Sequence, residues 1–570
     1  MKRIHLLLCS VLLLGTFNAN AQTTVPAGLV SGNWTLAGSP YIVQGGIMIA
    51  NGTTLSIDPG VTVNFQGSYI FLVMGRLIAI GTLADTITFT ATNTNIGWLG
   101  IRFNNTLSTN DTSKFFYCKL KYGRATAVAP NDCGGGFYFD SFSKAVISHS
   151  RISDCYATTF GGGIYCINSS NPPISYNVIS NNNAVGGGGG IYCYNSSNPI
   201  ISNNIISYNI VNGGSGGGGI YAYNSSSPSI LYNTITHNNS GRGGGIFCIQ
   251  SSATISHNTI AYNQAANDWG GGAIYTSGSG TSETISYNII SNNTALNSNG
   301  GAVFCGSQTL ISNNVISNNS STNNGGAIYS YMDTPTIINN TISNNSATLG
   351  NSLFCTSSSN PILRNSILWN SVASNQIYLD DDTSDPAIFN CDIQGGQAGI
   401  GLNTNVFYLG AYSNNINADP IFIAPSGGSG TSFNGVTANW TLQGNSPCVN
   451  AGSPSGSYPS TDLSGNPRVL NGIIDMGAYE ILSVGITNYE FQSQLTIYPN
   501  PFTSQTKLAF SEAQENLTIK IIDILGKEIK TINFTGIQIV IDKAEMKEGI
   551  YFVQIIDEQE HICNRKFIIL

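Results

Sequence analysis

A repeat of about 27 residues runs through the middle of this chain and limits its fold more than any other feature. Each unit begins with a glycine-rich stretch followed by an apolar residue, and successive apolar positions lie 25 to 29 residues apart. These positions are Phe137, Ile164, Ile191, Ile220, Ile246, Ile274, Val303, Ile328 and Leu353. A period of this length is typical of solenoids, in which each unit buries its apolar face only by stacking on its neighbours.

Short alternating apolar runs separated by Gly, Asn, Ser and Pro fill each unit, which predicts strands of three to five residues and no helix. Such strands become stable when their counterparts lie about 4.8 Å above and below in a parallel ladder. Asn also recurs once per unit, at Asn177, Asn204, Asn233, Asn258, Asn288, Asn314, Asn340 and Asn365. We expect stacked amides there, at corners with left-handed backbone.

Two other repeat architectures fit the sequence less well. A leucine-rich solenoid needs a Leu-x-x-Leu-x-Leu framework, which is absent, and a propeller needs blades of about 40 residues. The glycine runs, such as 186–190, are not followed by Gly-Lys-Ser or Gly-Lys-Thr, so they do not predict phosphate-binding loops. We interpret them as corners of the coils.

Cysteine also follows the repeat, at Cys166, Cys193, Cys248, Cys305 and Cys355. The chain contains no Cys-x-x-Cys pair, which argues against a zinc site. We expect a column of buried thiols. Neighbours such as Cys166 and Cys193 would lie about 5 Å apart, so a disulfide between them is the alternative in an oxidising compartment.

The N-terminus has the three parts of a secretory signal peptide. Basic residues at 2–3, an apolar stretch at 6–17 and the small-residue run 19–21 precede Gln22. We therefore predict a signal peptide over residues 1–21 and export of the rest. The apolar stretch is shorter than the roughly 18 residues of a membrane span. No later segment is apolar enough either, so the sequence predicts no transmembrane segment.

Charge separates the chain into a long, nearly uncharged part and a short charged part. Residues 134–370 contain four basic and five acidic side chains among 237, whereas residues 486–570 contain 19 charges among 85. This shift predicts a domain boundary near residue 485. A net charge of -8 with a pI near 5.1 argues against a nucleic-acid partner.

The repeat unit, roughly Gly-Gly-Ile-Tyr-Cys, then a Ser/Asn/Pro turn and Ile-Ser-x-Asn, resembles bacterial right-handed parallel β-helix repeat proteins, whose architecture pectate lyases share. The resemblance covers about residues 40–395 and includes opening coils at 55–61 and 97–101. It implies an N-terminal cap and first coils over 22–130 and regular coils over 131–395. The fold class we expect is therefore all-β: a right-handed parallel β-helix followed by a small antiparallel domain.

That last domain alternates apolar and polar residues, which predicts a small antiparallel β-sandwich over 486–570. It resembles the C-terminal sorting domain of proteins exported by type IX secretion. The resemblance implies the type IX machinery as a partner and a mature chain that is secreted or displayed on the outer cell surface. The motif residues are Tyr498, Pro499, Asn500, Pro501, Gly526, Gly549 and Tyr551.

Residues 396–485 resemble the choice-of-anchor domain that follows β-helices in surface proteins. The runs that carry the resemblance are 445–452, 462–468 and 475–480. Asn450 stands where that family usually has an acidic residue before Ala-Gly, so this chain departs from the family at that position.

Catalytic groups are sparse in the coils. A β-helix lyase needs clustered carboxylates for Ca²⁺ plus a Lys or Arg base, and a hydrolase needs paired carboxylates about 5 to 9.5 Å apart. No charged side chain occurs in 155–241, so we expect no catalysis. His149, His237 and His257 are expected at turn or packing positions. The alternative catalytic set is Asp140, Lys144, Arg151 and Asp154.

One acidic loop is a candidate metal site. Asp380, Asp381, Asp382 and Asp385 place four acids within six residues, which could hold Ca²⁺ together with backbone oxygens. A solvated acidic loop is the alternative interpretation. The sequence predicts no other cofactor.

An aromatic residue follows the apolar position of every unit, and strand alternation places the two on opposite faces. With Ile and Cys pointing inward, the aromatic residues would form an outward column that suits the CH-rich faces of a polymeric sugar. Its members are Tyr138, Tyr165, Tyr192, Tyr221, Phe247, Tyr275, Phe304, Tyr329 and Phe354. A packed ladder that stiffens the rod is the alternative.

The sequence therefore predicts a secreted or surface-displayed β-helix rod that binds a glycan or acts as an adhesin, without catalysis. A polysaccharide lyase or glycoside hydrolase of β-helix type is one alternative function. A purely structural surface protein is the other.

Overall fold

The computed structural model describes residues 22–570 apart from 214–215, 372–374, 457, 471, 482–494, 525, 545 and 558–561. The predicted signal peptide lies outside the described residues. Internal contacts divide the chain into one unit that ends at Ile481 and a second that ends at Leu570. The described residues form strands and two short 3₁₀ segments, η1 (Leu36–Gly38) and η2 (Gln397–Gly399), and none of their helices is long and apolar enough to cross a membrane.

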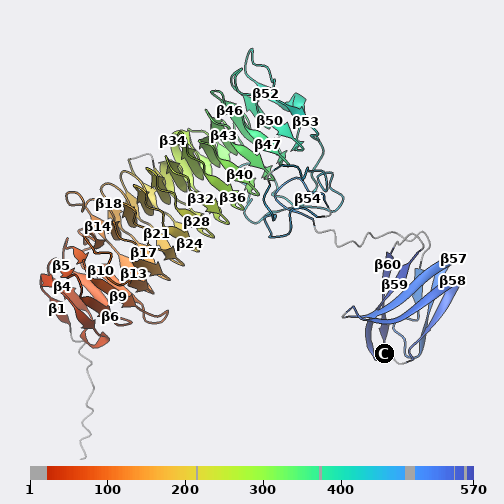
Figure 1. Ribbon diagram of the computed structural model, residues 1–570, viewed down its shortest axis with the longest axis horizontal. Helices are drawn as coiled ribbons and strands as arrows, with labels where there is room; N and C mark the ends of the chain where they lie inside the picture. The colour runs from red at the N-terminus through yellow and green to blue at the C-terminus, as the bar shows by residue number, and fades with distance from the viewer. Residues whose placement is uncertain are drawn as a thin grey trace, which may run out of the picture. The chain divides into compact units, whose positions relative to one another are not determined.

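The first unit is the expected parallel β-helix, drawn from red to blue-green in Figure 1. One coil consists of β19 (Ile164–Ile167), β20 (Ile174–Ser175), β21 (Val178–Ser180) and β22 (Asn183–Ala184). Each strand pairs in parallel with its counterpart one coil later, for example Ile164 with Ile191. The prediction of an all-β solenoid is confirmed.

Stacking of the coils produces four sheets, which we number in the order in which one coil visits them. Sheets I, II and III have 15 strands each and sheet IV has eight. Sheet II extends from β3 (Gly32–Trp34) to β53 (Tyr412–Ser413), and sheet IV from β14 (Arg124–Ala125) to β42 (Ser320–Ser321). All four are parallel, as expected for strands that recur once per coil.

Sheets I and III carry the surfaces discussed below. Sheet I consists of β2 (Gly28–Leu29), β5 (Ile47–Ile49), β8 (Phe71–Val73), β11 (Ile101–Phe103), β15 (Phe137–Asp140), β19, β23 (Ile191–Tyr194), β27 (Ile220–Tyr223), β31 (Ile246–Ile249), β35 (Ile274–Ser277), β39 (Val303–Gly306), β43 (Ile328–Tyr331), β46 (Leu353–Thr356), β49 (Ile377–Leu379) and β52 (Gly401–Leu402). Sheet III consists of β1 (Thr23–Val25), β4 (Tyr41–Val43), β7 (Thr62–Phe65), β10 (Ile87–Ala91), β13 (Cys118–Lys121), β17 (Arg151–Ser153), β21, β25 (Ile205–Ser207), β29 (Thr234–Thr236), β33 (Thr259–Ala261), β37 (Ile289–Ser291), β41 (Val315–Ser317), β45 (Thr341–Ser343), β48 (Ile367–Trp369) and β51 (Asp392–Ile393).

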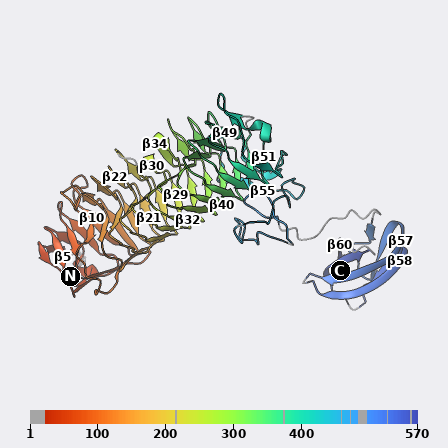
Figure 2. The same ribbon diagram turned by 45° about the horizontal axis from the view of Figure 1, so that its top comes forward.

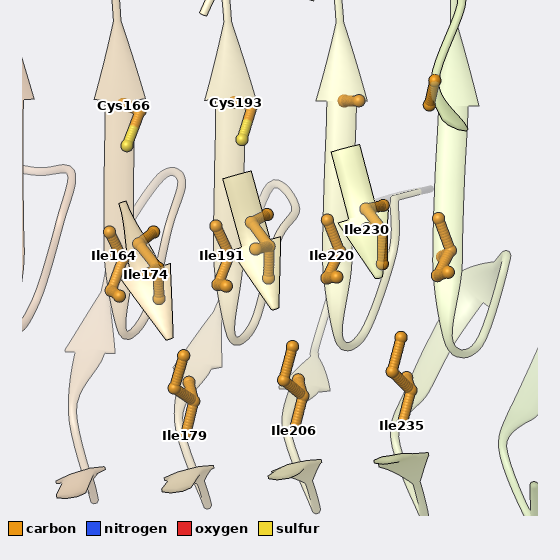
Figure 3. Packing of buried hydrophobic residues seen from close by; sticks show 14 of the residues in the cluster. Ile164, Cys166, Ile174, Ile179, Ile191, Cys193, Ile206, Ile220, Ile230 and Ile235 are labelled. Carbon is orange, nitrogen blue, oxygen red and sulfur yellow. The ribbon is translucent and has the colours of Figure 1, made fainter. Parts of the chain in front are cut away.

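The interior of the rod is a continuous apolar core built from columns of identical or similar residues. Ile164, Cys166, Ile174 and Ile179 of one coil are fully buried and repeat in the next coils. Figure 3 shows these columns side by side. The cysteines of the described residues are free thiols, including the neighbours Cys166 and Cys193. Burial raises the pKa of both thiols, which keeps them protonated and unreactive.

Buried asparagines form two hydrogen-bonded ladders along the rod, one at each edge of sheet III. The Nδ2 of Asn177 donates to the Oδ1 of Asn204 at 3.1 Å and to the carbonyl of Ile147 in the preceding coil at 2.9 Å. The backbone N–H of Asn177 donates to the same Oδ1 at 2.9 Å. Each buried amide thus finds hydrogen-bond partners in the neighbouring coils, which confirms the prediction of stacked amides.

The corner itself is made by the residue before the ladder asparagine, which corrects one expectation. Tyr176 and Asn203 have the left-handed backbone, with φ of 58° and 56°, whereas Asn177 and Asn204 follow them. The last residue of the predicted register, Asn365, is such a corner residue, and the ladder continues through the hydroxyl of Ser366. Period alone could not separate the two adjacent positions.

The end of the first unit folds back onto the rod. After β53, residues 419–481, here called the return segment, lie along sheet III over its later coils and include β54 (Phe422–Ala424) and β55 (Asn439–Leu442). Figure 2 shows β55 beside the later coils. Phe422, Trp440 and Met476 pack against Val315 and Ile367 of sheet III. The predicted choice-of-anchor-like region therefore packs with the rod in one unit.

The second unit is one five-stranded antiparallel sheet that curls around its own core. Its strands are β56 (Leu495–Tyr498), β57 (Gln505–Asp523), β58 (Glu528–Asp542), β59 (Gly549–Ile556) and β60 (Ile562–Ile569). The long β57 pairs with β56 near its start and with β59 near its end. The two layers expected of a sandwich thus come from a single curled sheet.

Candidate functional site

The predicted aromatic column lies on the outer side of sheet I, opposite the inward-pointing Ile and Cys residues. Neighbouring rings stack along the rod: Tyr165 and Tyr192 have centroids 5.2 Å apart, and Tyr275 and Phe304 4.4 Å apart. The column continues to Tyr378, stacked on Phe354 at 5.5 Å. At its N-terminal end the buried guanidinium of Arg102 lies 5.0 Å from the Tyr138 ring centroid.

These rings are buried rather than displayed. Tyr165 is 5% exposed, Tyr192 2% and Phe247 1%, and together they form a second apolar cluster outside the core. Phe160, from the glycine-rich loop, stacks on Tyr192 at 4.7 Å. Burial raises the pKa of Tyr329 to about 12, so its phenol stays neutral. The packed-ladder arrangement expected as the alternative describes this geometry, and a glycan contact at the column stays a prediction.

The glycine-rich loops fit over this column because they lack side chains. Gly161 has a φ of +67°, and a Cβ there would lie 2.7 Å from the carbonyl oxygen of Ile164 and 2.8 Å from Cβ of Tyr165. Gly188 repeats both features one coil later. The glycine runs are therefore corners, as predicted, and they also allow the loops to close over the rings.

The alternative catalytic residues are not brought together. Asp140 lies on sheet I and accepts hydrogen bonds from Ser141 and Asn168, at 2.9 and 2.8 Å. Arg151 lies on sheet III, and Asp154 is a corner residue that accepts from Ser153 at 2.8 Å. Lys144 donates to the carbonyl of Asn110 at 3.4 Å. None of the ion pairs in the described part of the chain joins two of these four side chains.

The acidic loop uses its carboxylates to hold its own turn and to bind backbone N–H groups of the neighbouring loops. Asp381 accepts from the backbone N–H of Thr383 at 3.0 Å and from that of Ser357 at 2.5 Å, and Asp385 accepts from Leu409 N–H at 2.7 Å. Burial opposes ionisation of Asp381, but these hydrogen bonds together keep its pKa below the usual value. Across the described ranges no three His, Cys, Asp or Glu side chains converge on a metal position. Calcium binding here stays a prediction.

Two columns of corner residues border sheet III, and the sequence interpretation missed them as a surface. Their side chains are exposed at earlier corners such as Tyr176 and buried at later ones such as Asn313 and Asn318. Column 1 separates sheets II and III and column 2 separates sheets III and IV; all their members have positive φ. Column 1 contains Tyr117, His149, Tyr176, Asn203, Tyr232, His257, Tyr287, Asn313, Asn339 and Asn365. Column 2 contains Tyr122, Asp154, Asn181, Tyr208, His237, Tyr262, Asn292, Asn318 and Asn344.

The aromatic members of these columns stack in short runs. Tyr208, His237 and Tyr262 have successive centroid separations of 4.7 and 5.2 Å. Tyr232, His257 and Tyr287 are separated by 4.7 and 4.8 Å. The histidines are thus turn and packing residues, as predicted. The columns could have been found in the sequence by comparing the residues that directly precede the ladder asparagines.

The later corners hold the return segment. Asn292 donates to the carbonyl of Phe433 at 2.6 Å and Asn318 to that of Gly428 at 2.8 Å. On the other side, Asn313 donates to the carbonyl of Thr461 at 2.6 Å and also accepts from Arg468. Arg468 in turn forms a buried ion pair with Glu480 at 2.8 Å. Asparagine side chains at these corners therefore bind the return segment through its backbone carbonyls.

The sorting motif gathers around the last strand of the second unit. Asn500 donates to the carbonyl of Lys566 at 3.0 Å and accepts from Ile568 N–H at 2.9 Å. Tyr551 stacks on Phe567 at 5.8 Å. Gly526 forms the turn after β57 with a φ of +81°, and Tyr498 is 80% exposed. The motif thus fixes the C-terminal strand and leaves one tyrosine free.

Comparisons with known proteins agree with this architecture. The family described as "Right handed beta helix region" matches residues 99–284 and 272–445, and the "Secretion system C-terminal sorting domain" matches residues 496–570. No curated protein matches the chain.

Two solved structures are similar to the chain at low identity. Pectate lyase Pel9A is 13% identical with a TM-score of 0.27, over 78% of this chain and 88% of that one. The enzymatically active domain of tailspike protein 2 of bacteriophage CBA120 is 11% identical with a TM-score of 0.21, over 92% and 72%.

The sorting domain indicates export through the type IX secretion machinery, to the medium or the cell surface. Together with the coils described above, the matches show that this chain belongs to the right-handed β-helix family and ends in a secretion-system sorting domain.

Proposed function

We propose that this protein is a glycan-binding or adhesive rod of the cell surface or the secreted medium, without catalysis of its own. The observation that carries the proposal is an exposed, uncharged surface with aromatic side chains: Tyr176, Tyr208 and Tyr232 are 55%, 52% and 56% exposed. Tyrosine offers a flat apolar ring together with a hydroxyl, which matches the two kinds of surface that a sugar presents. The predicted glycan contact at the column of sheet I would be a separate site on another face of the rod.

The separation of the acidic and basic side chains supports a role without catalysis. A glycosidase needs two carboxyl groups across one bond, and a lyase needs a base beside bound cations. Here Asp140 lies on sheet I, Arg151 on sheet III and Asp154 at the corner after that strand, and Asp381 and Asp385 accept hydrogen bonds from the backbone N–H groups of Thr383 and Leu409.

A panel of purified polysaccharides tests the proposal, with retention of the full-length protein and release of soluble products both measured. Retention without release is the expected result. Release of sugar fragments would replace the proposal with a lyase or hydrolase. Neither retention nor release on any polymer would favour a structural surface protein.

A further inference from the structure

We propose that the uncovered part of the sheet III face is the glycan-binding site, and that its ligand is an uncharged glycan whose sugar ring enters a gap at Asn203. This inference rests on the proposed function and adds a location and a chemical class to it. The face consists of β21, β25 and β29 between corner columns 1 and 2.

The gap in column 1 is bounded by two tyrosine ring faces. Tyr176 and Tyr232 lie one coil to either side of Asn203, about 10 Å apart at the rise of a parallel ladder. Each ring stacks on a histidine on its far side, His149 at 5.0 Å and His257 at 4.7 Å. The inner ring faces therefore look onto the smaller Asn203. A sugar ring midway between the two planes would lie about 5 Å from each, close enough for its C–H groups to contact the ring faces.

The floor of the face continues from this gap to a second open ring. Ile205 is 47% exposed on the strand that follows Asn203, and Val178 lies beside it on the neighbouring strand, half-buried. Beyond them, Tyr208 of column 2 stacks on His237 on one side only, because Asn181 occupies the corner before it. A chain that leaves the gap runs along β25 across the width of sheet III and meets the open face of Tyr208.

The other half of the same face is already a binding surface. Most of its corners are asparagines whose amides donate to backbone carbonyls of the return segment, including those of Gly428 and Thr461. At its border the hydroxyls of Tyr287 and Tyr262 also donate to this segment, at 3.3 Å each. The uncovered coils replace these asparagines with Tyr and His at five of the seven corner positions from Tyr176 to His257. The change replaces the two-donor amides with ring faces, each tyrosine keeping only its single hydroxyl donor. The residue type therefore favours a glycan over a second peptide segment.

Charge determines which glycans fit. Residues 155–241, which include the whole gap, contain no Asp, Glu, Lys or Arg. Within these coils a uronate polymer or an anionic lipid headgroup would find no cation, and the exposed Arg151 lies beside Val178 at the edge of the face. Polar groups come from the exposed amide of Asn203 and from the hydroxyls of the exposed tyrosines.

The test uses full-length protein with substitutions that the corners themselves already employ. Asn203→Tyr fills the gap with a residue found at the same corner in other coils, and the pair Tyr176→Asn with Tyr232→Asn removes both walls. We expect each variant to lose roughly tenfold or more in retention on neutral polymers such as cellulose, chitin, xylan, mannan or α-glucan. Phe407→Asn, at a 70% exposed ring in the 403–410 loop, is the matched control and should bind as wild type.

The outcomes separate the two proposals. Wild-type protein that no polymer retains overturns the proposed function, and the site with it. Wild-type retention that Asn203→Tyr leaves unchanged overturns the site alone, and retention only on polygalacturonate or alginate overturns the neutral class. Self-association of the wild type that is lost in Asn203→Tyr, without glycan retention, would assign the face to a second copy and overturn a glycan ligand.

Hydroxyl-radical footprinting checks the same face without substitutions. Wild-type protein is labelled with and without the retained polymer, and labelling of each tyrosine is measured by mass spectrometry. We expect protection of Tyr176, Tyr208 and Tyr232 and unchanged labelling of Phe407. Protection confined to other residues would overturn the assignment even if a variant were to misfold.

Discussion

The two halves of the sheet III face share one backbone and one interior but differ in their corner residues. Over the later coils the corners are Asn292, Asn318 and Asn313, and the return segment covers the strands between them. Over the earlier coils the corners include Tyr208, with its ring 52% exposed. Because the left-handed corner points its side chain outward, it can change without disturbing the coil. The comparison shows that two adjacent positions of each coil have different roles: the buried ladder residue stabilises the fold, and the corner residue before it determines what the surface can bind.

The largest loss of stability is expected in the covered half, where docking of the return segment depends on the buried charge of Arg468. Arg468→Ala leaves Glu480 without its cation and removes a bond to Asn313. Breaking a buried ion pair by removing one partner typically costs about 3 to 5 kcal/mol. We expect the return segment to be released, with protease sensitivity and hydrogen exchange rising in residues 419–481 while the earlier coils keep their protection. Unchanged protection of the segment would contradict the role of Arg468 in docking.

The interior should respond alike in both halves. Asn238→Ala, under the uncovered face, and Asn319→Ala, under the covered one, each remove an amide that donates to the next ladder member, at 2.9 and 3.0 Å. Buried groups left without partners cost about 1 to 3 kcal/mol. We expect similar losses in thermal stability for the two variants. A much larger loss on one side would mean that the ladders are not equivalent.

A corner exchange in the covered half should have a smaller effect. Asn318→Ala removes donations to the carbonyls of Gly428 and Gly430, at 2.8 and 3.2 Å. We expect a loss of about 1 to 2 kcal/mol in docking of the return segment, seen as local hydrogen exchange. The matched variant Asn181→Ala lies at the same column in the uncovered half and should leave that exchange unchanged.

Docking should also depend on pH. Burial raises the pKa of Asp392 to about 7, above its ordinary value near 4, and the carboxylate accepts from the Cys448 thiol of the return segment at 3.1 Å, with Asp419 nearby raising the pKa further. The folded state thus holds a proton that the unfolded state releases, so stability falls as pH rises from about 4 to about 7. We expect higher protection factors around Cys448, that is, exchange rates corrected for the intrinsic rate at each pH, at pH 5 than at pH 8. Asp392→Asn should flatten this difference.

The smallest effect on stability is expected at the uncovered corners. Tyr208→Asn exchanges an exposed ring for the residue used at other corners, and Asn adopts the left-handed backbone readily. We expect a change within about 0.5 kcal/mol in thermal unfolding, with any effect confined to ligand retention. A large loss of stability would show that the stacked corner rings hold the coil together.

Much of the rod follows from the sequence because its determinants are periodic. The positions of Ile164 and Cys166 repeat in every coil, so their inward direction and parallel pairing could be predicted. The ladder position was found for the same reason, although Tyr176 and Asn177 lie next to each other and period could not tell corner from ladder. A contact that occurs only once, such as the hydrogen bond from Arg468 to Asn313, has no periodic pattern and could not be predicted in this way.

The candidate surfaces were harder to predict than the coils. Alternation correctly separates Tyr165 from Cys166, but burial of Tyr165 depends on loop residues such as Phe160 and Gly161, which close over the sheet. Exposure at Tyr232 depends equally on where the return segment ends. Both are properties of tertiary packing, which a pattern within one coil does not contain.

The asparagine ladders give the rod a modular length. Every rung donates in the same direction, so the acceptor offered by Asn204 to Asn177 is equivalent to the one that Asn233 offers to Asn204, at 2.9 Å from backbone nitrogen in both cases. Deleting residues 177–203 would join Tyr176 to Asn204 and leave each remaining amide with a donor and an acceptor. Gain or loss of whole coils can therefore change the reach of such a rod between relatives while its end regions and its sorting domain stay the same.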